Sequence, residues 1–341
     1  MHLLTPAQLK YQLPLSPEIA SFIEEGQKRV QKIYDRHDQR TLLIVGPCSI
    51  HNVEEGLLFG QKLKKLADEV SEKCMLVMRS SVEKPRTSGG WKGLVHDPHL
   101  NDASDLSHGL FQARSFFLEL AKIGQPIAME FLTPMLAPYF EDLITWGWIG
   151  ARTSSSQIHR LLASDLPMPV GFKNSVDGNV AAAIHGVHVA KHPQTYAQID
   201  EEGKLIAKKS KGNPYAHVIL RGSNEETNFD SESVQSTLSQ LRQLELTPRV
   251  IIDCSHGNAR GHYFQQKEVF QNVLGQIEEG NQQILGMMIE SHLEAASQKL
   301  TPLLSELQPG VSITDPCLDF ASMEELVHLA YDSSSMVMSS T

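Results

Sequence analysis

The feature that most constrains the fold is a series of eight short apolar runs, rich in β-branched residues and spread along most of the chain. Each run is continuously apolar rather than alternating, which is typical of strands buried on both faces of a parallel sheet. The predicted strands are Leu42–Val45, Met75–Met78, Ile127–Phe131, Ile149–Arg152, Val170–Lys173, His217–Arg221, Val250–Asp253 and Leu285–Ile289.

Amphipathic stretches with helical periodicity lie between most of these strands. Examples are Val53–Val70, Leu110–Ile123, Pro138–Trp146, Ser231–Leu244 and Phe264–Glu278. Eight strands alternating with helices predict an α/β protein and favour a closed (β/α)₈ TIM barrel. A doubly wound open sheet is the alternative, because a strand count taken from sequence is easily wrong by one.

The 341 residues suffice for one large barrel or for two ordinary domains. We expect an N-terminal extension at residues 1–38, a barrel domain at 39–334 and a flexible tail at 335–341. The extension contains one predicted helix, Ser16–Tyr34, which follows Pro14 and is capped by Ser16.

A β-hairpin is predicted between the fifth and sixth strands, as an insertion at about 193–210. It comprises Thr195–Lys209 and turns at Glu202–Gly203. Its position outside the strand–helix alternation makes it an addition to the barrel rather than part of it.

Charge and cysteine usage limit the function classes. The formal net charge of -10 argues against a general nucleic-acid binder, because phosphate backbones attract basic surfaces. The four cysteines are widely spaced, without a disulfide framework, which fits a reduced compartment. We see no signal peptide and no apolar run near the ~20 residues of a membrane span. A cytoplasmic protein without membrane or nucleic-acid partners is therefore expected.

Chemistry-bearing residues follow the predicted strands. In TIM barrels the C-terminal ends of the strands carry the active site. Considered singly, each such residue is more often structural than functional: a buried thiol, a solvated charge or a structural imidazole. Agreement of all eight strand ends favours one functional rim. In strand order the residues are Cys48, Arg79, Glu130, Arg152, Lys173, Arg221, His256 and Glu290, with Asp315 in the next loop.

Four of these residues could bind a metal ion: Cys48, His256, Glu290 and Asp315. One thiolate, one imidazole and two carboxylates suit a divalent transition-metal ion such as Mn, Fe, Co or Zn, and the thiolate argues against Mg or Ca. Their spacing is not a compact motif. A buried cysteine with hydrogen bonds at the barrel rim is the alternative.

A second group is cationic. Several cations at one barrel mouth require more than one anionic group, for example two phosphates and a carboxylate. Three of them lie in the segment EKPRTSGGWKG, whose glycines allow backbone N–H groups to approach a ligand. The segment is therefore predicted to be an anion-binding loop. The group comprises Arg79, Lys84, Arg86, Lys92, Arg152, Lys173 and Arg221.

Other motifs give less support. His185, His188 and His192 share one face of a predicted helix, but no carboxylate accompanies them, so a solvated or packing face is favoured. The chain lacks the usual phosphate-loop, dinucleotide and nucleophile-elbow motifs. NTPase, nicotinamide-dependent and serine-hydrolase functions therefore lose their usual sequence support.

A family resemblance is carried by motifs running in order from about Pro6 to Leu329. The chain resembles the type I 3-deoxy-D-arabino-heptulosonate-7-phosphate (DAHP) synthases, which open the shikimate pathway. The resemblance implies metal-dependent condensation of phosphoenolpyruvate with erythrose 4-phosphate, with release of phosphate. The motifs are IVGPCSIH, EKPRT, GWKGL, WGWIGART, SQIHR, PVGFKN, HVILRG, DCSHGN, IESHL and SITDPC.

The resemblance also implies residue roles, of which catalysis is assigned to Lys84, Cys48 and His256. The water-positioning role of Glu130 is a hypothesis from strand order. The implied metal ligands are Cys48, His256, Glu290 and Asp315. The implied phosphoenolpyruvate site comprises Arg79, Lys84, Arg152, Lys173 and Arg221. The implied erythrose 4-phosphate site comprises Pro85, Arg86, Thr87 and Asp315. A homodimer or homotetramer and an aromatic amino-acid effector are the other partners implied.

Several positions depart from the family pattern, namely Ser80, Ser81, Val82, Ser155 and Pro167. Pro167 replaces a serine often associated with aromatic amino-acid inhibition, so no inhibitor is assigned. Two alternatives remain: an enzyme that makes 3-deoxy-octulosonate 8-phosphate from arabinose 5-phosphate, and a non-catalytic sensing paralogue. The KPRT loop favours the four-carbon sugar, and the intact ligand set argues against the paralogue.

Overall fold

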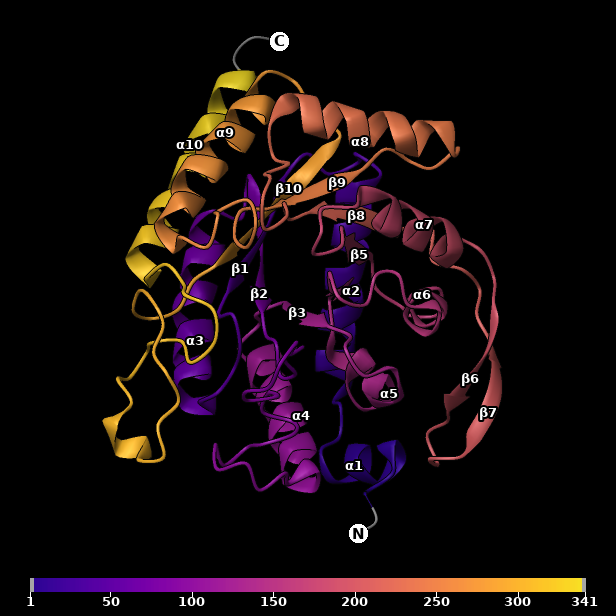
Figure 1. Ribbon diagram of the computed structural model, residues 1–341. Coiled ribbons are helices and arrows are strands. Elements are labelled where there is room, and N and C mark those ends of the chain that lie inside the picture. Colours follow the sequence, from indigo (N-terminus) through magenta and orange to yellow (C-terminus); the bar gives the residue numbers. More distant parts are fainter. Residues whose placement is uncertain (1–2, 339–341) are drawn as a thin grey trace.

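Eight parallel strands form a closed barrel in the computed structural model, which describes residues 3–338, with side chains to Ser333 (Figure 1). The order around the barrel is β1-β10-β9-β8-β5-β4-β3-β2. The predicted TIM barrel is therefore confirmed, and the open-sheet alternative is wrong. The strands are β1 Thr41–Gly46, β2 Cys74–Arg79, β3 Ile127–Glu130, β4 Trp146–Ile149, β5 Val170–Lys173, β8 His217–Leu220, β9 Val250–Asp253 and β10 Ile284–Glu290.

Every residue of these strands is buried, which explains the continuous apolar runs. Alternate side chains contribute to two apolar clusters. Leu42 and Ile44 of β1 belong to a cluster that also contains Trp146 and Trp148 of β4. Leu43 and Val45 belong to the larger cluster that the surrounding helices share. Both faces of each strand are thus covered, as in other barrels with helices outside.

The fourth strand is displaced from its predicted position. It spans Trp146–Ile149, whereas the sequence predicted Ile149–Arg152. The predicted helix Pro138–Trp146 is also wrong, because the helix there, α5, covers only Ala137–Phe140, between two 3₁₀ turns. Both errors arise from the two tryptophans of WGWI, which pack inside the barrel rather than on a helix face.

Helices surround the barrel in the predicted alternation. Most predicted helix bounds agree with the structure to within a few residues. Helix α10 extends into the predicted tail, and residues 339–341 lie outside the described part, so the division into extension, barrel and tail stays a prediction. The helices are α3 Val53–Glu69, α4 Leu106–Lys122, α6 Gln157–Ala163, α7 Val180–Lys191, α8 Ser231–Gln243, α9 Gln266–Glu278 and α10 Phe320–Met338.

The N-terminal segment contains two helices, α1 (Pro6–Gln12) and α2 (Pro17–Tyr34), where the sequence predicted one. The predicted Ser16 cap is present, since its hydroxyl accepts from the Ile19 N–H at 3.3 Å. The C-terminal part of α2 packs into the barrel-interior cluster through Ile33 and Tyr34. Helix α2 therefore closes the barrel at the end opposite to the one where strand ends carry chemistry.

The predicted hairpin is present as β6 (Thr195–Ile199) and β7 (Leu205–Lys209), paired antiparallel. It projects at the side of the barrel, near α1 (Figure 1). The Ala7 N–H donates to the Glu201 carbonyl at 2.9 Å, so the N-terminal segment and the insertion contact each other. No helix in the described residues has the length and apolar character needed to cross a membrane.

Candidate active site

A cavity of about 430 Å³ opens at the C-terminal ends of the barrel strands. It brings together every predicted site residue except Cys48, Thr87 and Lys92. Lining residues from the predicted set are Arg79, Lys84, Pro85, Arg86, Glu130, Arg152, Lys173, Arg221, His256, Glu290 and Asp315.

The remaining predicted residues lie near the cavity or outside it. Cys48 is fully buried, and its thiol lies 3.4 Å from Asp315 Oδ2. The Thr87 hydroxyl accepts from Arg152 Nε at 3.1 Å. Lys92 was predicted among the converging cations, but its side chain is exposed and it does not line the cavity. Its backbone carbonyl instead accepts from the Lys84 N–H at 2.9 Å, and this bond joins the two ends of the loop after β2.

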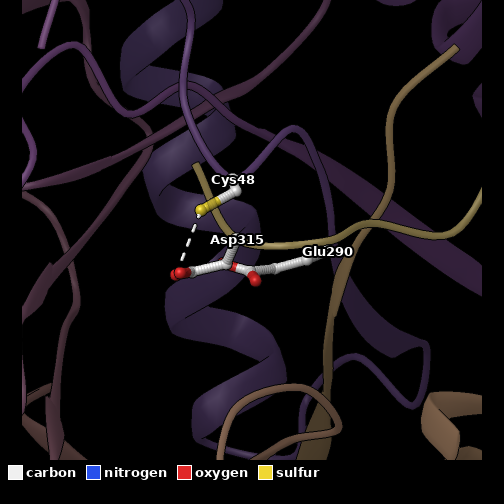
Figure 2. Close-up of side chains that lie close together, drawn as sticks. All are labelled: Cys48, Glu290 and Asp315. Carbon is white, nitrogen blue, oxygen red and sulfur yellow. Dashed lines mark hydrogen bonds between the residues drawn. The ribbon is translucent and has the colours of Figure 1, made fainter. Parts of the chain in front are cut away.

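Three predicted metal ligands form a compact group. One donor atom from each of Cys48, Glu290 and Asp315 lies within 4.8 Å of the others. The three side chains converge from separate segments in Figure 2. His256 stands at the edge of the group, with Nε2 3.6 Å from Glu290 Oε1. A thiol, two carboxylates and an imidazole within this distance are a donor set that fits a divalent transition-metal ion.

The electrostatics of this group depend on close neighbours. Burial and the Glu290 carboxylate raise the pKa of Cys48 to about 12, although the Lys84 ammonium acts in the opposite direction. Lys84 Nζ lies 3.0 Å from Cys48 Sγ. Enclosure disfavours the charged form of Asp315, but Lys84 and His256 outweigh it and lower the pKa of Asp315 to about 2. Without a cation at the group, the thiol keeps its proton, and metal binding would release it.

The cations of the cavity are mostly buried and only partly paired. Arg79 donates to Glu290 Oε1 at 2.7 Å and lies over the Trp148 ring at 5.1 Å. Arg79 Nε and Arg221 Nε are buried without a hydrogen-bond partner in the described structure. Buried donors left unpaired are costly. These two N–H groups are therefore available to an anion that enters the cavity.

Glu130 lies at the end of β3, against the backbone at Gly150. A Cβ atom at position 150 would overlap Glu130 Oε1. The glycine of the GART motif therefore leaves the space that the carboxylate occupies. Glu130 is 7% exposed and lines the cavity, so its carboxylate is close to any ligand held by the surrounding cations.

Several residues in the cavity wall or directly behind it were not singled out from the sequence. Trp148 lies beneath Arg79, and Arg260 is a further cation in the wall. Asp253 is fully buried and accepts from Lys173 Nζ at 2.7 Å. Burial disfavours its ionised form, yet His256 and Lys173 hold the pKa of Asp253 well below its ordinary value. The signal for Asp253 was present, because it is the last residue of the predicted strand VIID.

The fold and cavity define a class: a TIM-barrel enzyme for small anionic substrates, with a candidate transition-metal site beside its anion-binding cations. Comparison with known proteins agrees. Residues 20–328 match the model of the DAHP synthetase I family. The chain belongs to the DAHP synthetase I family.

Individual relatives are similar over almost the whole chain. A Tyr-sensitive phospho-2-dehydro-3-deoxyheptonate aldolase of Escherichia coli (strain K12) is 42% identical over 325 residues, covering 95% of this chain and 91% of the relative. A Trp-sensitive aldolase of the same strain is 38% identical over 325 residues, covering 95% and 93%. The structure of the phospho-2-dehydro-3-deoxyheptonate aldolase of Francisella tularensis SCHU S4 superposes with a TM-score of 0.95 at 35% identity, covering 98% and 97%.

The activity follows from this membership. The chain is an enzyme of the shikimate pathway's first step, the condensation of phosphoenolpyruvate with erythrose 4-phosphate to give DAHP and phosphate. The predicted family is thereby confirmed. The octulosonate-forming enzyme and the sensing paralogue are set aside.

Proposed function

We propose that the cavity performs this condensation with the residue roles expected from the sequence. Cys48, His256, Glu290 and Asp315 would hold one Mn, Fe, Co or Zn ion, which supplies Lewis-acid polarisation of an aldehyde carbonyl. The observation that carries the proposal is the convergence of three of these donors within 4.8 Å, beside buried cations with unpaired N–H groups.

The buried cations would hold phosphoenolpyruvate. Its phosphate fits Arg221, Lys173 and Arg152, and its carboxylate fits Arg79 and Lys84. Arg221 and Lys173 come from neighbouring strands, β8 and β5, so their spacing is fixed by the barrel. Rigid cations position the enol carbon and remove part of the entropic barrier to attack on the aldehyde.

The loop after β2 would receive erythrose 4-phosphate through Pro85, Arg86 and Thr87, with Asp315 opposite. Arg86 Nε donates to the Trp91 carbonyl at 2.8 Å, which leaves its terminal nitrogens for the sugar phosphate. Glu130 would orient the water that captures the positive character developing at C2 of phosphoenolpyruvate. Lys84 lies between the two sites, because its ammonium contacts Cys48 and its backbone belongs to the loop.

Assembly, regulation and location are proposed at a coarser level. The contact between α1 and the hairpin offers a surface for a homodimer or homotetramer. The two Escherichia coli relatives are described as a Tyr-sensitive and a Trp-sensitive enzyme. An aromatic amino-acid effector is therefore proposed without assigning which one. A cytoplasmic location fits the four free cysteines.

Metal dependence is the test of the proposed site. Chelator-treated protein should lose turnover, and Mn²⁺ should restore it. Cys48→Ala should reduce Mn²⁺ affinity by at least about tenfold, because one ligand is lost. Cys74→Ala is the matched control, since Cys74 is equally buried but begins β2 at the opposite end of the barrel. Equal Mn²⁺ affinity in both variants would refute the ligand assignment.

A further inference from the structure

Asp253 connects the two halves of the site. It ends β9, is fully buried and has no role in the scheme above. Its Oδ2 atom accepts from Lys173 Nζ at 2.7 Å and lies 2.9 Å from His256 Nδ1. One carboxylate oxygen therefore contacts both a proposed phosphate-binding cation and a proposed metal ligand.

The hydrogen bonds around Asp253 require a proton on Nδ1 of His256. The Ser255 hydroxyl donates to Asp253 Oδ1 at 2.6 Å, so its only proton is used. Ser255 Oγ also lies 2.6 Å from His256 Nδ1, where it can then only accept. Since neither the carboxylate nor this hydroxyl can donate to the ring, Nδ1 must be the donor. Nε2 then faces Glu290, 3.6 Å away.

The carboxylate is itself held rigidly. Asp253 Oδ1 also accepts from the Ser255 N–H at 3.0 Å, and the Asp253 carbonyl accepts from Asn258 Nδ2 at 2.9 Å. His256 has φ of 55°, a left-handed conformation that is unfavourable for a non-glycine residue and persists only where neighbours hold it. The Asp253 contacts provide such constraints on the turn that carries His256.

If Asp253 served only to neutralise the buried charge of Lys173, it would not need a contact with His256. Burying a charge pair is a weak source of stability, because desolvation offsets the attraction. A shared acceptor has a further consequence, since it fixes two functional groups relative to each other. Partners of metal-ligating histidines that accept the second ring N–H orient the ligand in this way.

We propose that Asp253 is a positioning residue that orients His256 toward the metal and Lys173 toward the substrate phosphate, so that one residue supports both binding events. The inference rests on the proposed function and adds a residue to it. It predicts that one isosteric substitution of Asp253 weakens the binding of both the metal ion and the substrate, although neither contacts Asp253 directly.

The test measures binding rather than turnover. Mn²⁺ affinity is measured by the electron paramagnetic resonance of free Mn²⁺, and phosphoenolpyruvate affinity by calorimetry on metal-free protein. Asp253→Asn should lower Mn²⁺ affinity by about 10–100-fold and phosphoenolpyruvate affinity by about tenfold. Asp142→Asn is the matched control, because Asp142 pairs with the buried Arg114 away from the cavity. It should change neither affinity.

The outcomes are distinguishable. A wild-type protein that binds neither ligand would overturn the proposed function itself. A wild-type protein that binds both, with a folded Asp253→Asn variant that binds them equally well, would overturn only this inference. If the variant does not fold, ¹⁵N-histidine spectra of the wild type decide, with the His256 signal assigned from His256→Gln. A proton on Nδ1 supports the proposal, and a ring whose only proton is on Nε2 contradicts it.

Discussion

Buried charged side chains in the cavity depend on partners of opposite charge and on the space that their neighbours leave. The Glu290 carboxylate is 1% exposed and is tolerated because Arg79 donates to it at 2.7 Å. Lys84 is buried beside Cys48, and the Cys48 sulfur together with the nearby carboxylates keeps the pKa of Lys84 above its ordinary value despite burial. At this scale, charge pairing and available volume decide whether the site can function.

Gly150 tests the importance of volume. Gly150→Ala would place a Cβ atom in the space that Glu130 Oε1 occupies, so the carboxylate must move. We expect kcat to fall by about a hundredfold, the order of loss that follows a misplacement of about 1 Å in an active site. Steady-state kinetics measure this change.

Gly275→Ala is the control for this substitution. Gly275 lies in α9, and the position that an added methyl group would take has no atom of another segment within 4 Å, so alanine should leave kcat unchanged. Wild-type turnover in Gly150→Ala would show that the position of Glu130 is unimportant for the reaction.

At the scale of elements, buried polar side chains fasten helices to the barrel. Arg114 of α4 is fully buried and donates to both carboxylate oxygens of Asp142 at 2.8 Å. It also donates to the Leu13 carbonyl at 3.1 Å, which attaches the N-terminal segment. His217 begins β8 beneath Trp146, whose indole N–H donates to it at 3.2 Å.

Arg114→Met should destabilise the fold by about 3 kcal/mol, because it removes the partner of the half-buried Asp142 carboxylate and the bonds to two backbone carbonyls. Denaturant unfolding measures the free energy of unfolding. Arg29→Met removes an exposed pair with Glu25 at 3.5 Å and should cost less than about 0.5 kcal/mol. Equal effects of the two substitutions would contradict the role assigned to Arg114.

His217 makes stability depend on pH. Burial lowers its pKa to about 4 in the folded protein, below its ordinary value of 6.5. Between these values the unfolded chain binds a proton that the folded chain does not, so stability falls as pH falls from 6.5 to 4. The contribution of this residue to the fall is about 3 kcal/mol.

His217→Gln removes the titrating group and keeps a hydrogen-bonding side chain. Its free energy of unfolding, measured across this pH range, should therefore fall less steeply than that of the wild type. Parallel curves would mean that His217 is already protonated in the fold or stays neutral in the unfolded chain.

The sequence was most informative where burial was uniform. Eight apolar runs located the strands because a parallel barrel covers both faces of each one. The strand prediction failed at β4, because Trp146 and Trp148 gave no periodicity that distinguishes a strand from a helix. Helix α1 was missed because its burial depends on contacts with distant segments, such as the bond from Ala7 to Glu201.

The candidate site was predictable to a similar extent. Strand-end positions gave Arg79, Lys173 and Glu290, because the topology alone brings strand ends together. The shared contacts of Asp253 could not be read from the chain, since they depend on side-chain rotamers across β5 and β9. Lys92 was misplaced for the same reason, because its loop turns the side chain outward.

At the scale of the whole molecule, the metal site joins segments from both ends of the chain. Cys48 follows β1, whereas Glu290 and Asp315 lie near the C-terminus. A ligand that binds only the folded state raises stability by mass action, by about 2.7 kcal/mol at a hundredfold excess over Kd. Mn²⁺ should therefore raise the melting temperature of chelator-treated protein, measured by calorimetry. An unchanged melting temperature in Cys48→Ala, beside a raised one in the wild type, would locate the effect at this site.

The most direct test of the account is product analysis after reaction of Mn²⁺-loaded protein with phosphoenolpyruvate and erythrose 4-phosphate. We predict loss of phosphoenolpyruvate, equimolar release of phosphate and formation of the seven-carbon DAHP, with none formed from arabinose 5-phosphate. No product with any divalent metal, or a product formed only from arabinose 5-phosphate, would contradict it.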